Sequence, residues 1–367
     1  MAQKRMTYYM ALVSAAEWGD VEWVRARLLA APEIDVNRAD EGKRTPLMVA
    51  SKGGHLEVVK LLLGAPGIDV NPANKAGSTP LSWASWFGHL GVVKLLLAAP
   101  GIDVNRANKR GRTPLYWASY KGHLGVMKLL LAAPGIDVNG ADKVVGTPLI
   151  SASVEGHSEV VKLLLAAPEI DVNRADKYGR TPLMVASQKD HLGVVKLLLA
   201  APGIDVNRAD EGGWTPLYWA SQKGHLEVVK LLLAAPGIDV NRSDIWWCTP
   251  LFVASQEGHT EVAKLLLAAP GIEVFKKDNE GKSAMDVAVT SEVATLLEKV
   301  VAVKRTFGVL LLTLAHRGIS RDMAAQLAMH GLPSEEAKAM AVRMRDTWPA
   351  ATSAPRDHSV CDARESS

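Results

Sequence analysis

The chain has 367 residues, of which 48% are hydrophobic and 22% are charged, as is typical of a folded protein with a sizeable core. Its 42 basic and 39 acidic residues give a net charge of +3, which neither favours nor excludes nucleic acid, so any charged binding surface must be local. Its two cysteines, Cys248 and Cys361, cannot form a disulfide framework and favour a reducing compartment or independence of redox state.

The N-terminal segment "MAQKRMTYYMALVSAAEWGD" weakly resembles a signal peptide, because basic residues precede a short apolar run and small residues. The apolar run over residues 8–13 is shorter than the hydrophobic region of such peptides. We therefore interpret residues 1–8 as an extension and the segment from residue 9 as an amphipathic helix. This helix begins a first unit that carries charge on its outer side: Glu17, Asp20, Glu22, Arg25 and Arg27.

Periodicity is the dominant feature of the sequence that follows. Thr-Pro-Leu begins at residues 45, 79, 113, 147, 181, 215 and 249, always 34 residues after the previous copy. A degraded copy begins at Ser283, and segments similar to Val-Asn-Arg-Ala-Asp recur with the same spacing. A fixed period of this length is typical of a protein built from stacked repeats.

Each repeat predicts two short helices. Thr45 is a good N-cap, and Pro46 stands at the first helical position, where its missing N–H costs nothing. Gly54 suits the left-handed turn that ends this helix, and residues 56–63 form a second helix from which Lys60 points outward. Neither helix is long enough to be stable alone, so each repeat must bury one face on its neighbours. In the first helix this face is a stripe of small residues: Leu47, Ala50, Ser51 and Gly54.

The recurring pattern resembles the ankyrin repeat, whose usual period is 33 and whose signature is Thr-Pro-Leu-His-x-Ala. The resemblance covers residues 9–300 and implies an all-α ankyrin-repeat solenoid of stacked helix-turn-helix units with β-turn fingers. About nine repeats are expected, namely an N-terminal cap, seven 34-residue repeats and a short C-terminal cap at 282–300. The histidine after Pro-Leu is absent, so the family's Thr–His hydrogen bond cannot form. We expect the residues in its place to pack instead: Met48, Ser82, Tyr116, Ile150, Met184, Tyr218 and Phe252.

The sequence beyond the repeats predicts a small C-terminal helical extension over 301–348, in which Ser320 and Ser334 are candidate N-caps. Residues 349–367 are rich in Ala, Ser, Pro and charge and predict a disordered tail. The apolar run at 307–315 is far shorter than the roughly 20 residues that span a bilayer. We therefore expect no membrane span.

The repeats differ at a few positions, which in stacks of this kind lie on the finger tips and on the exposed side of the first helix, lining a concave groove. These positions carry aromatic residues beside cations, the residue types that dominate binding hot spots. One group lies in the second and third Thr-Pro-Leu repeats and another in the sixth and seventh, roughly 40 Å away at about 10 Å per stacked helix pair. The candidate partner-binding residues are Trp86, Phe87, Tyr120, Lys121, Arg110, Arg112, Tyr178, Trp214, Trp246 and Trp247.

The tryptophans at the second position after Thr-Pro-Leu allow two interpretations. Trp83, Trp86 and Phe87 lie at i, i+3 and i+4 and form one stripe. We interpret Trp83, together with its counterparts Trp117 and Trp219, as filling gaps between repeats, although a place in the groove stays possible. Trp86 and Phe87 we interpret as an exposed contact site.

Two ladders of polar residues favour structural roles. Histidines recur at 55, 89, 123, 157, 191, 225 and 259, but stacked helices lie roughly 8–10 Å apart, too far for two of them to share a zinc ion. We expect each to bond the backbone of a turn. The arginines of "NRAD" are each followed by Asp or Asn and form a solvated face. No phosphate loop, HExxH, CxxC or GxSxG motif is present, so we expect no cofactor, no metal and no enzyme activity.

The sequence therefore predicts a non-enzymatic scaffold that binds a protein or peptide in its groove, with no nucleic acid. We expect a monomer in the cytoplasm. An alternative is a two-part adaptor, in which the repeats recruit a client and 301–348 docks onto a larger complex such as a ubiquitin ligase. A third possibility, an enzyme using 301–348, is weak, because His316 and His330 have no cysteine or triad beside them. The partner's identity lies beyond the sequence, because binding surfaces vary independently of the fold.

Overall fold

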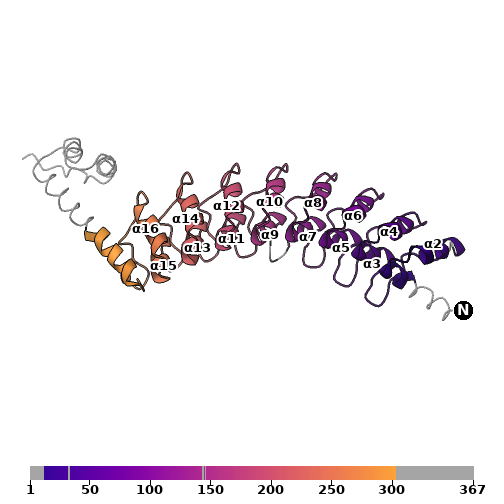
Figure 1. The fold of residues 1–367 in the computed structure, drawn as a ribbon, viewed down its shortest axis with the longest axis horizontal. Coiled ribbons are helices and arrows are strands. Elements are labelled where there is room, and N and C mark those ends of the chain that lie inside the picture. Colours follow the sequence, from indigo (N-terminus) through magenta and orange to yellow (C-terminus); the bar gives the residue numbers. More distant parts are fainter. Residues whose placement is uncertain (1–11, 32–33, 143, 145, 303–367) are drawn as a thin grey trace, which may run out of the picture. The chain divides into compact units, whose positions relative to one another are not determined.

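The computed structural model describes residues 12–31, 34–142, 144 and 146–302. Among these residues, regular structure is helical, and β pairing is limited to the isolated bridges Asp142–Gly146 and Lys277–Ser283. The chain divides into two compact units, residues 1–294 and 295–367. The first unit contains all of the repeats that carry Thr-Pro-Leu, and the predicted all-α solenoid is confirmed there (Figure 1).

The first helix of each repeat begins as its sequence predicts. The threonine of Thr-Pro-Leu is the N-cap, and its hydroxyl accepts a hydrogen bond from the backbone three residues later, as between Thr113 and Tyr116 (3.1 Å). Proline follows at the first helical position. Most of these helices end at a left-handed glycine such as Gly122 (φ 71°). The first helices are α3 (Pro46–Gly53), α5 (Pro80–Phe87), α7 (Pro114–Lys121), α9 (Pro148–Glu155), α11 (Pro182–Gln188), α13 (Pro216–Lys223) and α15 (Pro250–Gln256).

The second helix of each repeat runs back along the first and buries only one side. In α4, Val58, Val59 and Leu62 are buried while Lys60 is exposed, as predicted. Figure 1 shows the second helices in a row of their own beside the row of first helices. They are α4 (Leu56–Leu63), α6 (Leu90–Leu97), α8 (Leu124–Leu131), α10 (Ser158–Leu165), α12 (Leu192–Leu199), α14 (Leu226–Leu233) and α16 (Thr260–Ala268).

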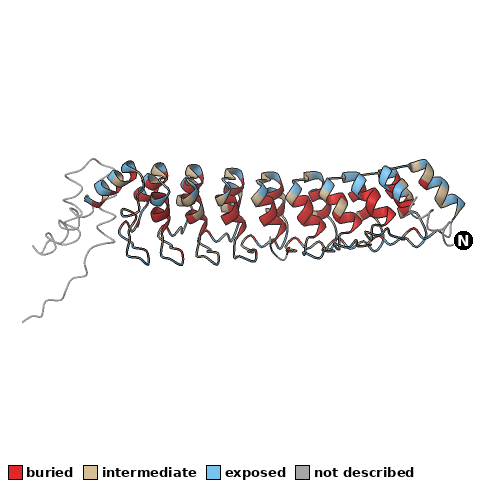
Figure 2. Ribbon diagram, turned by 90° about the horizontal axis from the view of Figure 1, so that it is seen from below, coloured by how far each residue is buried: buried red, intermediate tan, exposed pale blue. Residues whose placement is uncertain are grey.

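The core lies mainly along the row of first helices, each of which packs against the next first helix and against its own second helix (Figure 2). The residues after Pro-Leu are all buried, so the packing predicted for them is confirmed. Ser82 does more than pack. Its hydroxyl accepts from the Thr79 backbone N–H (2.7 Å) while the Thr79 hydroxyl accepts from the Ser82 N–H (3.2 Å), which closes a capping box. A side-chain hydrogen bond is therefore restored in this repeat without a histidine.

Two hydrogen-bond ladders join successive repeats. The histidine before each second helix contacts a carbonyl in the preceding repeat, as His123 Nε2 does with Trp86 O (3.0 Å). The histidines thus bond the backbone as expected, but at the end of the preceding first helix and not at a turn. The asparagine of "DVN" links to the following repeat in two directions. Asn105 Nδ2 donates to Gly135 O (2.7 Å), and Asn105 Oδ1 accepts from Asp137 N (2.8 Å). Seven asparagines at this position make the same pair of bonds: Asn37, Asn71, Asn105, Asn139, Asn173, Asn207 and Asn241.

The ends of the stack depart from the repeat. At the N-terminal end, residues 12–18 are helical and α2 (Val21–Ala30) follows, capped by Asp20. At the C-terminal end, the expected first helix is reduced to turns over 284–287, where the Asp286 carboxylate accepts from both the Ser283 N–H (2.8 Å) and hydroxyl (2.6 Å). A helix then begins at Ser291 and is described to residue 302. The predicted extension at 1–8, nearly all of the segment at 301–348 and the tail at 349–367 lie outside the described residues.

Candidate interaction surface

Each finger tip is held by the carboxylate or amide that begins it. In the third repeat, Asn108 Oδ1 accepts from the backbone N–H groups of Arg110 (2.9 Å) and Arg112 (3.1 Å). Asn74 does the same in the second repeat, and aspartate takes this place in the others. Because one Asn or Asp side chain holds the loop backbone, the remaining side chains of each finger are free to differ from repeat to repeat.

An aromatic patch joins α5 to α7, and we define it as Trp83, Trp86, Phe87, Trp117 and Tyr120. Trp86 lies at its centre, with its ring centroid 4.0 Å from that of Trp117 and 6.2 Å from that of Tyr120. Trp83 stacks on Phe87 at 5.9 Å. The side chains at i, i+3 and i+4 of one helix thus meet the corresponding side chains of the next, as their spacing requires.

Exposure varies across the aromatic patch. Phe87 is 43% exposed, whereas Trp117 is 7% exposed, so the predictions of a surface phenylalanine and a gap-filling Trp117 are confirmed. Trp86 is half-buried, so it is less exposed than the prediction of an exposed contact site implied. The Trp117 ring edge covers one part of it, and Lys121 Nζ lies 4.8 Å from its ring centroid. Trp83 is also half-buried.

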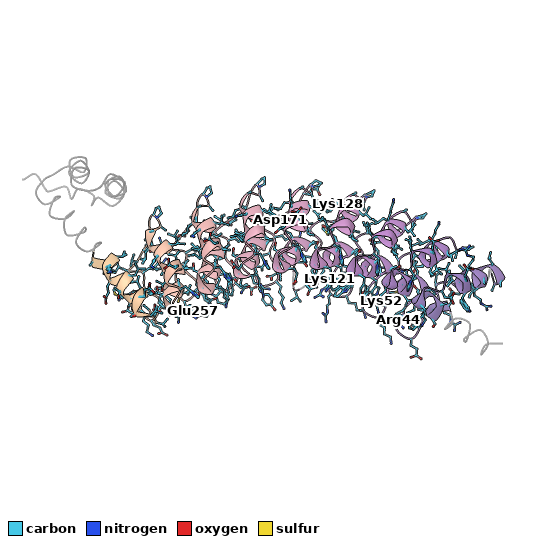
Figure 3. The ribbon with its side chains drawn as sticks, in the orientation of Figure 1. Arg44, Lys52, Lys121, Lys128, Asp171 and Glu257 are labelled. Carbon is cyan, nitrogen blue, oxygen red and sulfur yellow. The ribbon has the colours of Figure 1, made fainter. Side chains whose placement is uncertain are left out.

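Cations border the aromatic patch. Lys121 Nζ lies 5.0 Å from the Tyr120 ring as well as over Trp86, and Lys52 Nζ lies 5.5 Å from the Trp83 ring. Both lysines are exposed, and Figure 3 shows them on the side of the first helices, opposite Lys128 of the second-helix row. Each ammonium group is attracted by the quadrupole of the ring beneath it, so the two lysines hold positive charge beside the apolar rings.

A cavity of about 130 Å³ opens into the aromatic patch. Trp83, Trp86 and Trp117 form its apolar walls, and Ser78 and Ser82 complete the lining. This volume suits a single side chain rather than a whole small-molecule ligand. A larger cavity of about 500 Å³ lies between α2 and α4, and its lining has no aromatic side chain. One of its lining residues, Ile34, comes directly after residues 32–33, which the structure does not describe.

Comparison with known families identifies the repeats. The family model for ankyrin repeats (3 copies) matches residues 73–142, 139–210 and 174–244. The model for ankyrin repeats (many copies) matches 28–82 and 237–288. The chain belongs to the ankyrin-repeat family. A search of curated proteins finds no match. Ankyrin repeats are generally protein–protein interaction modules and typically have no enzymatic role, so the variable surface of this ankyrin-repeat chain is the place to look for a partner site.

The two candidate arginines of the third ankyrin finger have different environments. Arg110 is exposed at the tip. Arg112 is not on a free rim, because its Nε donates to Asp142 Oδ2 of the next finger (2.7 Å) and its guanidinium lies 4.8 Å from the Trp117 ring. In the first finger Arg44 pairs with Asp40 of its own finger (2.7 Å). Asn108 has no charge to offer Arg112, which therefore reaches across to the following repeat.

Most of the second group of candidates lies on exposed finger tips. Trp246 and Trp247 are 47% and 60% exposed. Trp247 has φ 68°, at a position where the neighbouring fingers carry glycine, a conformation that bulky residues rarely adopt. Trp214 is half-buried, 6.2 Å from Trp246 and 4.9 Å from Trp219. The structure therefore brings Trp214 and Trp246 of neighbouring fingers together.

The fifth finger presents Tyr178, which is 45% exposed. Lys177 Nζ lies 4.6 Å and the Arg180 guanidinium 5.1 Å from its ring centroid. Arg180 is also bound to Asp176 of the same finger (2.7 Å). Tyr178 is thus an isolated aromatic contact, separate from both groups of tryptophans.

Titratable groups with perturbed pKa values lie in the late fingers. Burial, then the Asp244, Asp278 and Glu280 carboxylates, raises the pKa of the Cys248 thiol to about 12. Burial and Asp244 raise the pKa of the Tyr218 phenol, which donates to Asp244 Oδ2 (3.0 Å). These shifts keep both groups neutral and do not activate a nucleophile. Over the described part of the chain, no three His, Cys, Asp or Glu side chains form a metal site, and no helix has the length and apolar character to cross a bilayer.

One feature that the sequence interpretation missed is the asparagine that begins the second and third fingers. Asn74 and Asn108 replace the aspartate found in six other repeats: Asp40, Asp142, Asp176, Asp210, Asp244 and Asp278. Sequence comparison among the repeats could have found this replacement. Its effect on charge and hydrogen bonding is apparent only in the structure, which places each finger beside the tryptophans.

Proposed function

We propose that this ankyrin-repeat chain is a non-enzymatic scaffold that binds a protein or peptide at the aromatic patch of α5 and α7. Phe87, Trp86 and Tyr120 supply apolar contact, and Lys121 and Arg110 supply positive charge beside it. The observation that carries the proposal is the cavity of about 130 Å³ between Trp83, Trp86 and Trp117. Binding hot spots are aromatic anchors and pockets of this kind, bordered by charge.

The late fingers are a secondary contact region in this proposal. Trp246 and Trp247 expose large apolar surfaces on these finger tips. An extended partner held at the aromatic patch would reach them, or a second partner would use them, with Tyr178 lying between the two regions. We further propose a monomer in the cytoplasm. The role of 301–348 in a two-part adaptor stays a separate hypothesis.

The test is a selection of random 12-residue peptides displayed on phage against the full chain. Peptides that bind the parent should lose at least about 30-fold in affinity for the Trp86→Ala, Phe87→Ala variant, since hot-spot anchors contribute about 2 kcal/mol or more. The matched control is Trp246→Ala, Trp247→Ala, which removes two exposed aromatics from a late finger. Equal binding of every selected peptide to the parent and to the first variant would show that the partner site lies elsewhere.

A further inference from the structure

We infer that the segment recognised by the aromatic patch is acidic: a peptide stretch with Asp or Glu side chains flanking one apolar side chain that enters the cavity. This inference rests on the proposed function and adds the chemistry of the partner. Charge, hydrogen-bond donors and the lining of the cavity support it.

The finger tips beside the aromatic patch carry only positive charge. Residues 74–78 and 108–112 contain four cations, Lys75, Lys109, Arg110 and Arg112, and no acid. Arg112 is paired with Asp142, but no acid among the described residues pairs with the other three. The corresponding tips at 210–214 and 244–248 contain three acids, Asp210, Glu211 and Asp244, and no cation. The field along the fingers therefore favours an anionic segment at the aromatic patch and disfavours it at the late fingers.

The indole N–H groups of the aromatic patch have no acceptor among the described residues. Trp219, by contrast, donates to Asp210 Oδ2 (3.4 Å), and Trp214 donates to Asp244 Oδ2 (3.2 Å). At the position of Asp210 the third repeat has Asn108, whose Oδ1 accepts backbone N–H groups and whose other terminal atom is a donor. Trp83, Trp86 and Trp117 thus keep donors for a ligand that brings acceptors, as carboxylates do.

The cavity itself selects an apolar side chain. Its walls are three tryptophans, and the Ser82 hydroxyl in its lining is already engaged, donating to Thr79 O (2.8 Å) and accepting from Thr79 N. Nucleic acid, the other polyanion, would need free ring faces on which bases stack. Trp83 is stacked on Phe87, and Trp86 is covered by Trp117 and Lys121. An acidic peptide with one apolar anchor fits the surface better.

The direct test restores the missing acids. Asn74→Asp, Asn108→Asp adds two negative charges at positions where six other repeats carry aspartate, so the fold tolerates the change. Acidic peptides selected on the parent should bind this variant about tenfold more weakly at low salt, and their Glu→Gln versions should bind parent and variant alike. The matched control, Lys189→Gln, Lys223→Gln, changes net charge by the same amount on α11 and α13 and should leave binding unchanged.

The outcomes separate this inference from the proposed function. Loss of binding in Trp86→Ala, Phe87→Ala together with unchanged binding in Asn74→Asp, Asn108→Asp would overturn the acidic partner while leaving the interaction site in place. Selected peptides without an excess of Asp and Glu would overturn it too. So would a 12-residue oligothymidylate that binds through Trp86 and Phe87 more tightly than any selected peptide. Unchanged binding in both variants would overturn the proposed function itself.

Discussion

The segments 113–119 and 215–221 have the same sequence, Thr-Pro-Leu-Tyr-Trp-Ala-Ser, and form the same capped helix, yet their tryptophans have different environments. Trp117 is buried between Trp86 and Arg112. Trp219 is half-buried and donates to Asp210. The difference comes from neighbours outside the segment: Asn108 against Asp210 in the preceding finger, and Trp86 against Gln188 on the preceding first helix. Identical helices thus become a candidate binding surface in one place and an internally satisfied cluster in the other.

The scaffold beneath the two regions is alike, and the differences are confined to its surface. Both repeats have the threonine cap, the left-handed glycine and the asparagine ladder. The ladder and the caps satisfy the backbone, so side chains on the first helix and finger can change without disturbing the stack. This separation explains how one repeat sequence accommodates both Trp and Gln at the same helical position.

The largest expected effect is the loss of the buried tryptophan. Trp117→Ala should lower the free energy of unfolding by on the order of 3 kcal/mol, because it removes a buried ring that packs on Trp86 and Arg112. Trp219→Ala, the same change in the sixth repeat, should cost less, since that side chain is partly solvated. Chemical denaturation of the two variants measures the difference, and equal losses would mean that the two environments are energetically equivalent.

Cysteine reactivity distinguishes the late fingers. With its pKa raised from 9.0 to about 12, the Cys248 thiol stays protonated at pH 8, and its alkylation in the folded chain should be on the order of 100-fold slower than in the denatured chain. The folded pKa lies above the unfolded value, so the stability from this thiol is present below pH 9 and is lost as the pH rises toward 12. Iodoacetamide labelling of a Cys361→Ser variant measures this rate, and fast labelling would show an ionised thiol.

The asparagine ladder tests whether the scaffolds are in fact alike. Asn105→Ala and Asn207→Ala each remove two hydrogen bonds to the next repeat, Asn105 at 2.7 and 2.8 Å and Asn207 at 2.6 and 2.8 Å. Each should cost about 1–2 kcal/mol of unfolding free energy. If only one of the two variants loses stability, the two regions differ in how their repeats are joined and not only in their surface side chains.

The smallest expected effect lies at the turn between α11 and α12 of the fifth repeat. Asp190 has φ 60° where most first helices are followed by glycine, so Asp190→Gly should raise stability by roughly 0.5–1 kcal/mol. Its carboxylate also lies 3.8 Å from His225 Nδ1, a contact that the glycine variant would lose. If the unfolding midpoint is unchanged or falls, the contact with His225 stabilises the fold by at least as much as the backbone strain at Asp190 destabilises it.

The sequence predicted the scaffold well because each local signal has one physical meaning. Thr-Pro fixes a helix start, Gly54 fixes its end, and a period of 34 leaves stacking as the way to bury the apolar faces. It predicted the surface less well, because half-burial of Trp86 and pairing of Arg112 depend on residues from adjacent repeats. The left-handed conformation of Asp190 can be read from the sequence, because Asp190 stands before His191 where the other repeats have glycine before the histidine. The role of Asn108 could not be predicted from the sequence, because it depends on a tryptophan donor in the same repeat and on an acid in the next.

The central claim is that a partner binds on α5 and α7 rather than on the late fingers. Hydrogen–deuterium exchange of the full chain with and without a selected acidic peptide tests it most directly. The predicted result is slower exchange at the C-terminal turns of α5 and α7, residues 84–88 and 118–122, with no change at 244–248. Protection confined to 210–214 and 244–248 would contradict the account.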